Sequence, residues 1–138
     1  MLVTAYGRSY NLPILHTRGN NVYGPSQYPE KTVAKFILLA LCGSKISIHG
    51  SGLATRSYMH VDDAAAALDI IFSQAGKTFQ VYNIGAHDER SILSVAHDVC
   101  RLIGRDPNES ITHVSDRAFN DRRYYIDCSK LTEFGWKQ

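Results

Sequence analysis

Two arginines far apart in the sequence, Arg56 and Arg117, carry side chains well suited to binding phosphate. A guanidinium presents a planar fork of hydrogen-bond donors and keeps its charge near neutral pH. Arg117 lies in the run Asp116–Tyr124, which holds five charged side chains and a phenol within nine residues. Two such forks predict a clamp on a diphosphate. The same run is also compatible with a solvated loop whose charges pair with one another.

The composition is that of an ordinary soluble protein with one core. The 138 residues are 44% hydrophobic and 20% charged, with a net charge of +2, which suits a single domain. That charge is too small to indicate a nucleic-acid-binding protein. The longest apolar run, Phe36–Cys42, is far shorter than the roughly 20 residues of a membrane span. We therefore expect no nucleic-acid partner and no membrane insertion.

The three cysteines, Cys42, Cys100 and Cys128, are odd in number and widely spaced. Neither C-x-x-C nor H-E-x-x-H occurs, so the sequence indicates neither a disulfide framework nor a metal site. Residues 1–15 show no secretory signal. Reduced thiols are typical of the cytosol, and we expect a cytoplasmic protein without a bound metal.

Strands alternate with helices along the chain, which favours an α/β or α+β fold. Strands are expected at 14–18, 46–49, 58–61, 81–84 and 111–114, and helices at 1–7, 29–41, 64–72, 92–103 and 129–134. Asn20–Pro25 is expected to be a loop, since Asn, Gly and Pro favour turns. Pro29 suits the first turn of the helix expected at 29–41. Asp62 or Asp63 would cap the helix expected at 64–72.

Further expectations concern the first residues of the chain and its C-terminal third. The residues 1–7 are typical of the interior or end of an amphipathic helix without its cap, so we expect a piece of a longer protein. Ser91 should cap the helix 92–103, whose apolar stripe ends at Gly104. Trp136 is expected to be a core anchor.

Several of these segments occur together, and in the same order, in one family. They are Asn21-Val-Tyr-Gly-Pro, Pro29-Glu-Lys, Ile48-His-Gly-x-Gly, Arg56, Val61-Asp-Asp, Tyr82-Asn-Ile-Gly, the run Asp116–Tyr124 and Gly135-Trp. The set resembles the C-terminal part of the extended short-chain dehydrogenase/reductase proteins, over essentially the whole chain. Within them it resembles the nucleotide-sugar 4,6-dehydratases, above all the UDP-glucose 4,6-dehydratase domain of rhamnose synthases.

The resemblance implies the C-terminal part of an NAD(P)-binding Rossmann fold, mainly its small substrate-binding subdomain. Residues 1–25 would be remaining elements of the Rossmann domain, and 26–138 the substrate-binding region. The helix at 62–74 would pack back on the Rossmann part, leaving apolar faces around Tyr6 and Leu68 uncovered here. The full-length protein would use NAD, form a homodimer and convert UDP-glucose or dTDP-glucose to the 4-keto-6-deoxy sugar.

The resemblance also assigns roles to single residues. The substrate-binding residues would be Asn21, Lys31, Thr32, Ser47, Ile48, His49, Arg56, Asn83, Arg117 and Asn120, and the cofactor-binding residue Val22. Arg56 and Arg117 would grip the diphosphate and ribose, on one side of a cleft with Asn21 and His49 at its rim. The family's NAD-binding glycines, acid/base pair and Tyr-x-x-x-Lys pair are expected upstream of residue 1. We therefore assign no catalytic residue here, and expect the isolated chain to be inactive and to bind NAD weakly.

Two other functions stay open. A UDP-sugar epimerase or decarboxylase would share the fold, although Pro29-Glu-Lys and Asp121-Arg-Arg-Tyr favour a dehydratase. A non-catalytic module that binds nucleotides or a protein partner is the second alternative.

Overall fold

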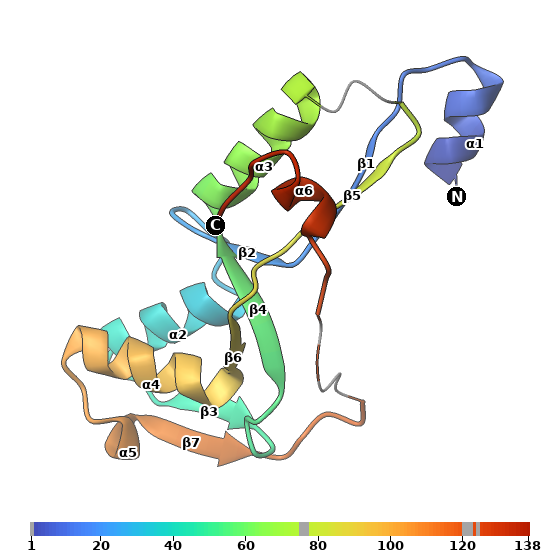
Figure 1. Cartoon of the computed structure of the whole chain (residues 1–138). Coiled ribbons are helices and arrows are strands. Elements are labelled where there is room, and N and C mark those ends of the chain that lie inside the picture. The colour runs from blue at the N-terminus through green and yellow to red at the C-terminus, as the bar shows by residue number, and fades with distance from the viewer. Residues whose placement is uncertain (1, 75–77, 120–122, 124) are drawn as a thin grey trace.

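The computed structural model describes every residue except 1, 75–77, 120–122 and 124, and helices alternate with strands along it (Figure 1). The helices are α1 (Leu2–Ser9), α2 (Thr32–Leu41), α3 (Val61–Gln74), α4 (Ile92–Ile103), α5 (Pro107–Ser110) and α6 (Ser129–Thr132). The strands are β1 (His16–Gly19), β2 (Asn21–Tyr23), β3 (Ile46–His49), β4 (Thr55–His60), β5 (Val81–Ile84), β6 (Glu89–Ser91) and β7 (Ile111–Val114). The predicted α/β class is confirmed.

Within the described part of the chain the strands form three short sheets, in which most pairings are parallel. β1 pairs with β5, β3 with β7 and β2 with β4 in parallel, whereas β6 runs antiparallel to β4. Parallel strands require crossover connections, which helices supply in α/β units. β4 runs between two parts of the molecule (Figure 1), because its first residues pair with β6 and its last residues pair with β2.

Each of these two parts has its own apolar core, whereas the composition predicted a single one. The first core comprises Met59, Ala67, Ile71, Tyr82, Ile84, Ala86, Cys128, Leu131 and Trp136, and the second Phe36, Ala40, Ile46, Ile48, Ala96, Val99 and Cys100. Trp136 is 2% exposed, and its indole N–H donates to the carbonyl of Asp63 at 3.1 Å. Its predicted role as a core anchor is confirmed. The predicted division of the chain at residue 25 stays a prediction.

The sequence signals at the two ends of α4 predicted this helix correctly. The Ser91 hydroxyl accepts from the Ser94 N–H at 3.0 Å at the start of α4, which satisfies a donor left free by the first turn. Gly104 ends the helix at a φ of 77°, a conformation that glycine adopts without steric cost. The cap, the apolar stripe and the end of α4 are confirmed.

Other boundaries differ from the sequence prediction. The stretch predicted as a loop, Asn20–Pro25, contains β2, because pairing with β4 overrides its local turn preference. α2 begins at Thr32 rather than at Pro29: Lys31 is extended and caps it without a side-chain hydrogen bond. Asp62 and Asp63 lie inside the first turn of α3. A carboxylate there interacts favourably with the positive end of the helix dipole, but it is not the capping residue. β6 and α5 were not predicted.

The uncovered apolar surface that was predicted is present on α1 and in part on α3. The side chains of Leu2, Val3 and Tyr6 are exposed, whereas Leu68 packs against the first core and Phe72 is exposed. Among the described residues, no helix is both long and apolar enough to cross a membrane.

Candidate functional site

A cavity of about 400 Å³ lies where α2, β2, β3 and β4 meet. Its lining comprises Asn21, Val22, Tyr23, Gln27, Glu30, Lys31, Thr32, Val33, Lys35, Phe36, Ser47, His49, Gly52, Ala54, Arg56, Tyr58, Ile92 and Arg117. Side chains alternate between the two faces of a strand. This explains why residues 47 and 49 of β3, and residues 54, 56 and 58 in and beside β4, all line the cavity.

Most of the residues predicted to bind substrate or cofactor gather here. Asn21, Val22, Lys31, Thr32, Ser47, His49, Arg56 and Arg117 all line this cavity, although they come from five separate stretches of the chain. The predicted convergence of Arg56 and Arg117 on one cavity, together with Asn21 and His49, is therefore seen in the structure. Their binding of a substrate stays a prediction.

Three predicted residues are not part of the described lining. Ile48 is fully buried in the second core, because it alternates with Ser47 and His49 along β3. The side-chain amide of Asn83 donates to the carbonyl of Asp127 at 2.8 Å, so it fastens the chain before α6. Asn120 lies outside the described residues.

The cavity is electropositive. Four basic side chains line it, Lys31, Lys35, Arg56 and Arg117, against the single carboxylate of Glu30 in the described lining. Glu30 and Lys31 form an ion pair of 3.0 Å in which both side chains are mostly exposed, and such a pair contributes little energy. The surplus of cations favours an anionic ligand with more than one charge.

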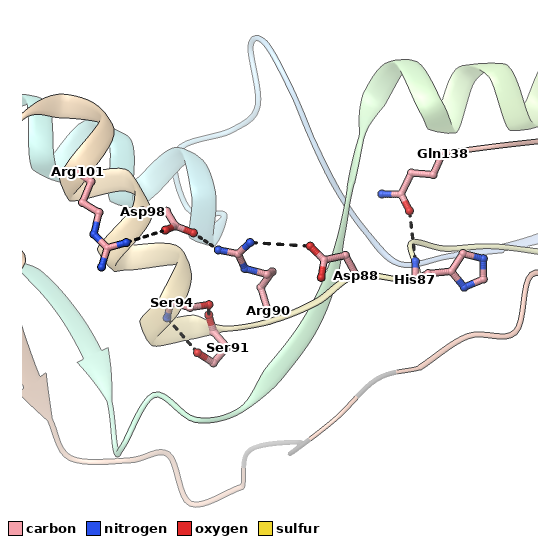
Figure 2. A network of polar contacts seen from close by, with 8 residues as sticks. All are labelled: His87, Asp88, Arg90, Ser91, Ser94, Asp98, Arg101 and Gln138. Atoms are coloured by element: carbon pink, nitrogen blue, oxygen red, sulfur yellow. Dashed lines mark hydrogen bonds and ion pairs between the residues drawn. The ribbon is translucent and has the colours of Figure 1, made fainter.

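Arg56 is oriented by its own strand and stands opposite another arginine. Its Nη1 donates to the carbonyl of Thr55 at 2.7 Å. Arg90 of β6 lies directly across the antiparallel pair, where two like charges repel each other. Asp98 of α4 binds the Arg90 guanidinium, and Asp88 lies 3.9 Å from it (Figure 2). These carboxylates therefore neutralise Arg90, which is not among the residues described as lining the cavity.

Tyr58 was missed by the sequence analysis, although it lies two residues after Arg56 on the same face of β4. Burial raises the pKa of its phenol, while the charge of Arg56 and the hydroxyl of Thr32 act in the opposite direction. The buried Tyr58 hydroxyl makes no full hydrogen bond within the described residues, although the Thr32 hydroxyl is close enough to influence its pKa. A neutral phenol with free bonding capacity is suited to a polar ligand atom.

Further lining residues follow from helical and turn geometry. Lys35 lies in the first turn of α2, and its N–H donates to the carbonyl of the capping residue Lys31 at 2.8 Å, so both lysines reach the lining from the start of this helix. Gln27 donates from its side-chain amide to the carbonyl of Val22 at 2.7 Å, which closes the loop after β2. A second, mainly apolar cavity of about 430 Å³ adjoins this loop and shares Tyr23, Gln27 and Val33. No group of three potential metal ligands occurs among the described residues.

Comparison with known proteins places this geometry in a family. Residues 1–85 match the NAD dependent epimerase/dehydratase family. The chain is 51% identical over 138 residues to a trifunctional UDP-glucose 4,6-dehydratase/UDP-4-keto-6-deoxy-D-glucose 3,5-epimerase/UDP-4-keto-L-rhamnose-reductase of Arabidopsis thaliana, covering 100% of this chain and 20% of that protein.

Two solved structures share the fold closely. A dTDP-glucose 4,6-dehydratase from Bacillus anthracis in complex with NAD is 38% identical, with a TM-score of 0.88 over 99% of this chain and 43% of that one. A UDP-glucose 4-epimerase from Thermotoga maritima with UDP-glucose is 28% identical, with a TM-score of 0.89 over 99% and 44% of the two chains. The chain thus spans less than half the length of these relatives. It belongs to the NAD dependent epimerase/dehydratase family.

Proposed function

We propose that this chain supplies the substrate-binding cavity of an NAD-dependent nucleotide-sugar 4,6-dehydratase acting on UDP-glucose or dTDP-glucose. The observation that carries the proposal is the gathering of Lys31, Arg56 and Arg117 in one cavity with hydroxyl and amide side chains. A diphosphate needs several cationic donors at once, and arginine forks match its oxygens in pairs. The sugar and ribose hydroxyls need the neutral polar groups.

Each part of the ligand has suitable neighbours in the lining. Arg56 and Arg117 would hold the diphosphate, with Lys31 contributing a further positive charge. Asn21 and Thr32 would bind hydroxyl groups. His49 offers a flat ring to the base, and its Nδ1 lies 3.2 Å from the carbonyl of Ser115, so the ring is held in place before a ligand arrives.

Hydride-transfer chemistry in this reaction would be supplied by a bound NAD. Val22, half-buried in the cavity lining, is the residue of this chain that would lie beside the nicotinamide. The sequence contains no G-x-x-G-x-x-G, the pattern whose turn and helix N-terminus bind the pyrophosphate of such cofactors. The residues present therefore fit the edge of the cofactor site only, and their own role is to bind and orient the nucleotide.

An epimerase function is the second candidate, because the Thermotoga maritima epimerase has the same fold. The higher identities, 51% to a protein with a 4,6-dehydratase activity in its name and 38% to a 4,6-dehydratase structure, favour the dehydratase. Product analysis with the full-length protein separates the two. A dehydratase releases water and gives a 4-keto-6-deoxy sugar, whereas an epimerase gives an isomer of the same mass.

A ligand series tests the binding proposal on the 138-residue chain itself. Calorimetric titrations with uridine, UMP and UDP should show affinity that rises with each phosphate and falls with added salt, because the recognised groups are charged. Equal affinity for all three ligands would refute diphosphate recognition. NAD should bind more weakly than UDP, and tight NAD binding would show that the cofactor site lies within this chain.

A further inference from the structure

Arg117 lies among residues 115–119, which form neither helix nor strand, and the start of this stretch is tied to the turn after β3. The Gly50 N–H donates to the carbonyl of Val114 at 2.9 Å. The Nδ1 of His49 is 3.2 Å from the carbonyl of Ser115. The carboxylate of Asp116 accepts the N–H of Arg117 at 2.8 Å. The first two contacts attach residues 114 and 115 to the turn, and the third orders the backbone locally at Arg117.

A second attachment lies six residues beyond Arg117, at Arg123. The Nε of Arg123 donates to the two carboxylate oxygens of Glu89 at 2.8 and 3.0 Å, and Nη2 donates to one of them at 2.6 Å. The side chain of Glu89 is only 21% exposed. Its pKa is lowered mainly by the hydrogen bonds from Arg123. Two donors from one planar fork define a direction as well as a distance.

The Arg123–Glu89 pair is joined to the strand that presents Arg56. The backbone of Arg123 forms a parallel bridge with Thr55, beside Arg56, and Glu89 lies opposite Ser57 across the antiparallel pair. Because side chains alternate along a strand, Thr55 and Ser57 lie on the face of β4 away from the cavity. The chain is thus fastened on one face of β4 by Arg123, while Arg117 lies in the cavity on the other.

We propose that Glu89 is a positioning residue for the nucleotide site: by holding Arg123, it keeps residues 115–119 in place and so keeps Arg117 in the cavity lining. The expected effect of Glu89 on ligand binding rests on the proposed function. Its effect on the order of the chain does not depend on any ligand. A short connection attached at both ends loses less conformational entropy on binding than one attached at a single end.

The ligand-free test measures backbone order by ¹⁵N NMR relaxation in the unmodified chain and in Glu89→Gln. We expect the amides of residues 115–119 to lose order in Glu89→Gln. Asp98→Asn is the matched control, since it breaks the ion pair of the neighbouring Arg90 (Figure 2) and leaves the Arg123 contact intact. Unchanged order at 115–119 in Glu89→Gln overturns the proposal. Should that variant fail to fold, Arg123→Lys removes the planar fork and must loosen the same amides.

The effect on ligand binding is tested by measuring UDP affinity in a double-mutant cycle. Glu89→Gln should weaken UDP binding about threefold, as expected for the loss of a favourable ion pair. The loss caused by Arg117→Gln should be smaller in the Glu89→Gln background, while the loss caused by Arg56→Gln should be unchanged. An equal Arg117→Gln effect in both backgrounds contradicts the inference. If the unmodified chain does not bind UDP, the proposed function fails, and the relaxation result still decides the role of Glu89.

Discussion

The turn after β3 allows a test of how the backbone near Arg117 is held. Gly50 has a φ of 58°, and a Cβ there would lie 2.6 Å from Oδ2 of Asp116. Oδ1 of the same carboxylate accepts the N–H of Arg117. Gly50→Ala therefore adds backbone strain and displaces Asp116. Gly43 has a φ of 73° with no heavy atom within 4 Å of a Cβ, so Gly43→Ala is a matched control that adds strain alone.

The two substitutions should differ by the Asp116 contact. A side chain in the left-handed region costs about 1 kcal/mol in both variants. Loss of the charge-assisted hydrogen bond adds about 1.5 kcal/mol at Gly50. We therefore expect Gly43→Ala to lower the free energy of unfolding by about 1 kcal/mol and Gly50→Ala by about 2.5 kcal/mol.

Urea unfolding followed by circular dichroism measures both free energies, and UDP titration of the folded variants reports on the site. Gly50→Ala should weaken UDP binding, whereas Gly43→Ala should leave it unchanged. Equal destabilisation by the two variants, or unaltered UDP affinity in Gly50→Ala, would show that the Gly50 turn and Asp116 do not hold Arg117.

Three further predictions concern the folded chain. Ser91→Ala removes the cap that accepts the Ser94 N–H, and should lower the free energy of unfolding by about 1 kcal/mol in urea titrations; no loss would mean that the cap is dispensable. Ile48→Val should cost about 1 kcal/mol of stability, since Ile48 is fully buried, while UDP titration should give an unchanged Kd; a weakened Kd would make Ile48 a ligand residue. Hydrogen bonds from the Ser129 N–H and hydroxyl lower the pKa of Asp127 below 3.8, so its stabilising effect is present above the unfolded pKa and is lost as the pH falls through the lower folded value. Urea midpoints measured below about pH 5 should therefore fall less steeply in Asp127→Asn, and an identical slope would contradict this.

Patterns that depend on neighbouring residues predicted much of the fold. The Ser91 cap, the apolar stripe of α4 and the turn at Gly104 are local signals, and each has its expected structure. β2 was missed because Asn21 and the flanking Asn20, Gly24 and Pro25 favour turns, while pairing with β4 makes residues 21–23 a strand. β6 contains charged residues, Glu89 and Arg90, whose place in the sheet comes from their partners across β4.

The residues of the site, like the elements of the fold, were predicted only in part. Most of the residues selected by resemblance to a family line the cavity, but the resemblance carried no information on which face each strand presents. Ile48 was selected together with Ser47 and His49, although the period of two along β3 directs it into the core. Tyr58 could have been found from the same period, two residues after Arg56. The attachment of Arg123 to Glu89 joins residues 34 apart in sequence, and no local pattern predicts it.

Binding of a nucleotide's diphosphate by Arg56 and Arg117 is tested by measuring the affinity of the chain for UDP in Arg56→Gln and Arg117→Gln. Arg101→Gln is the control, because this arginine lies on α4 with a side chain 69% exposed. We predict that each of the first two variants loses about 2 kcal/mol of binding free energy, roughly a thirtyfold rise in Kd, and that the control binds as the unmodified chain does. Unchanged Kd values in both Arg56→Gln and Arg117→Gln would show that these arginines do not bind the diphosphate.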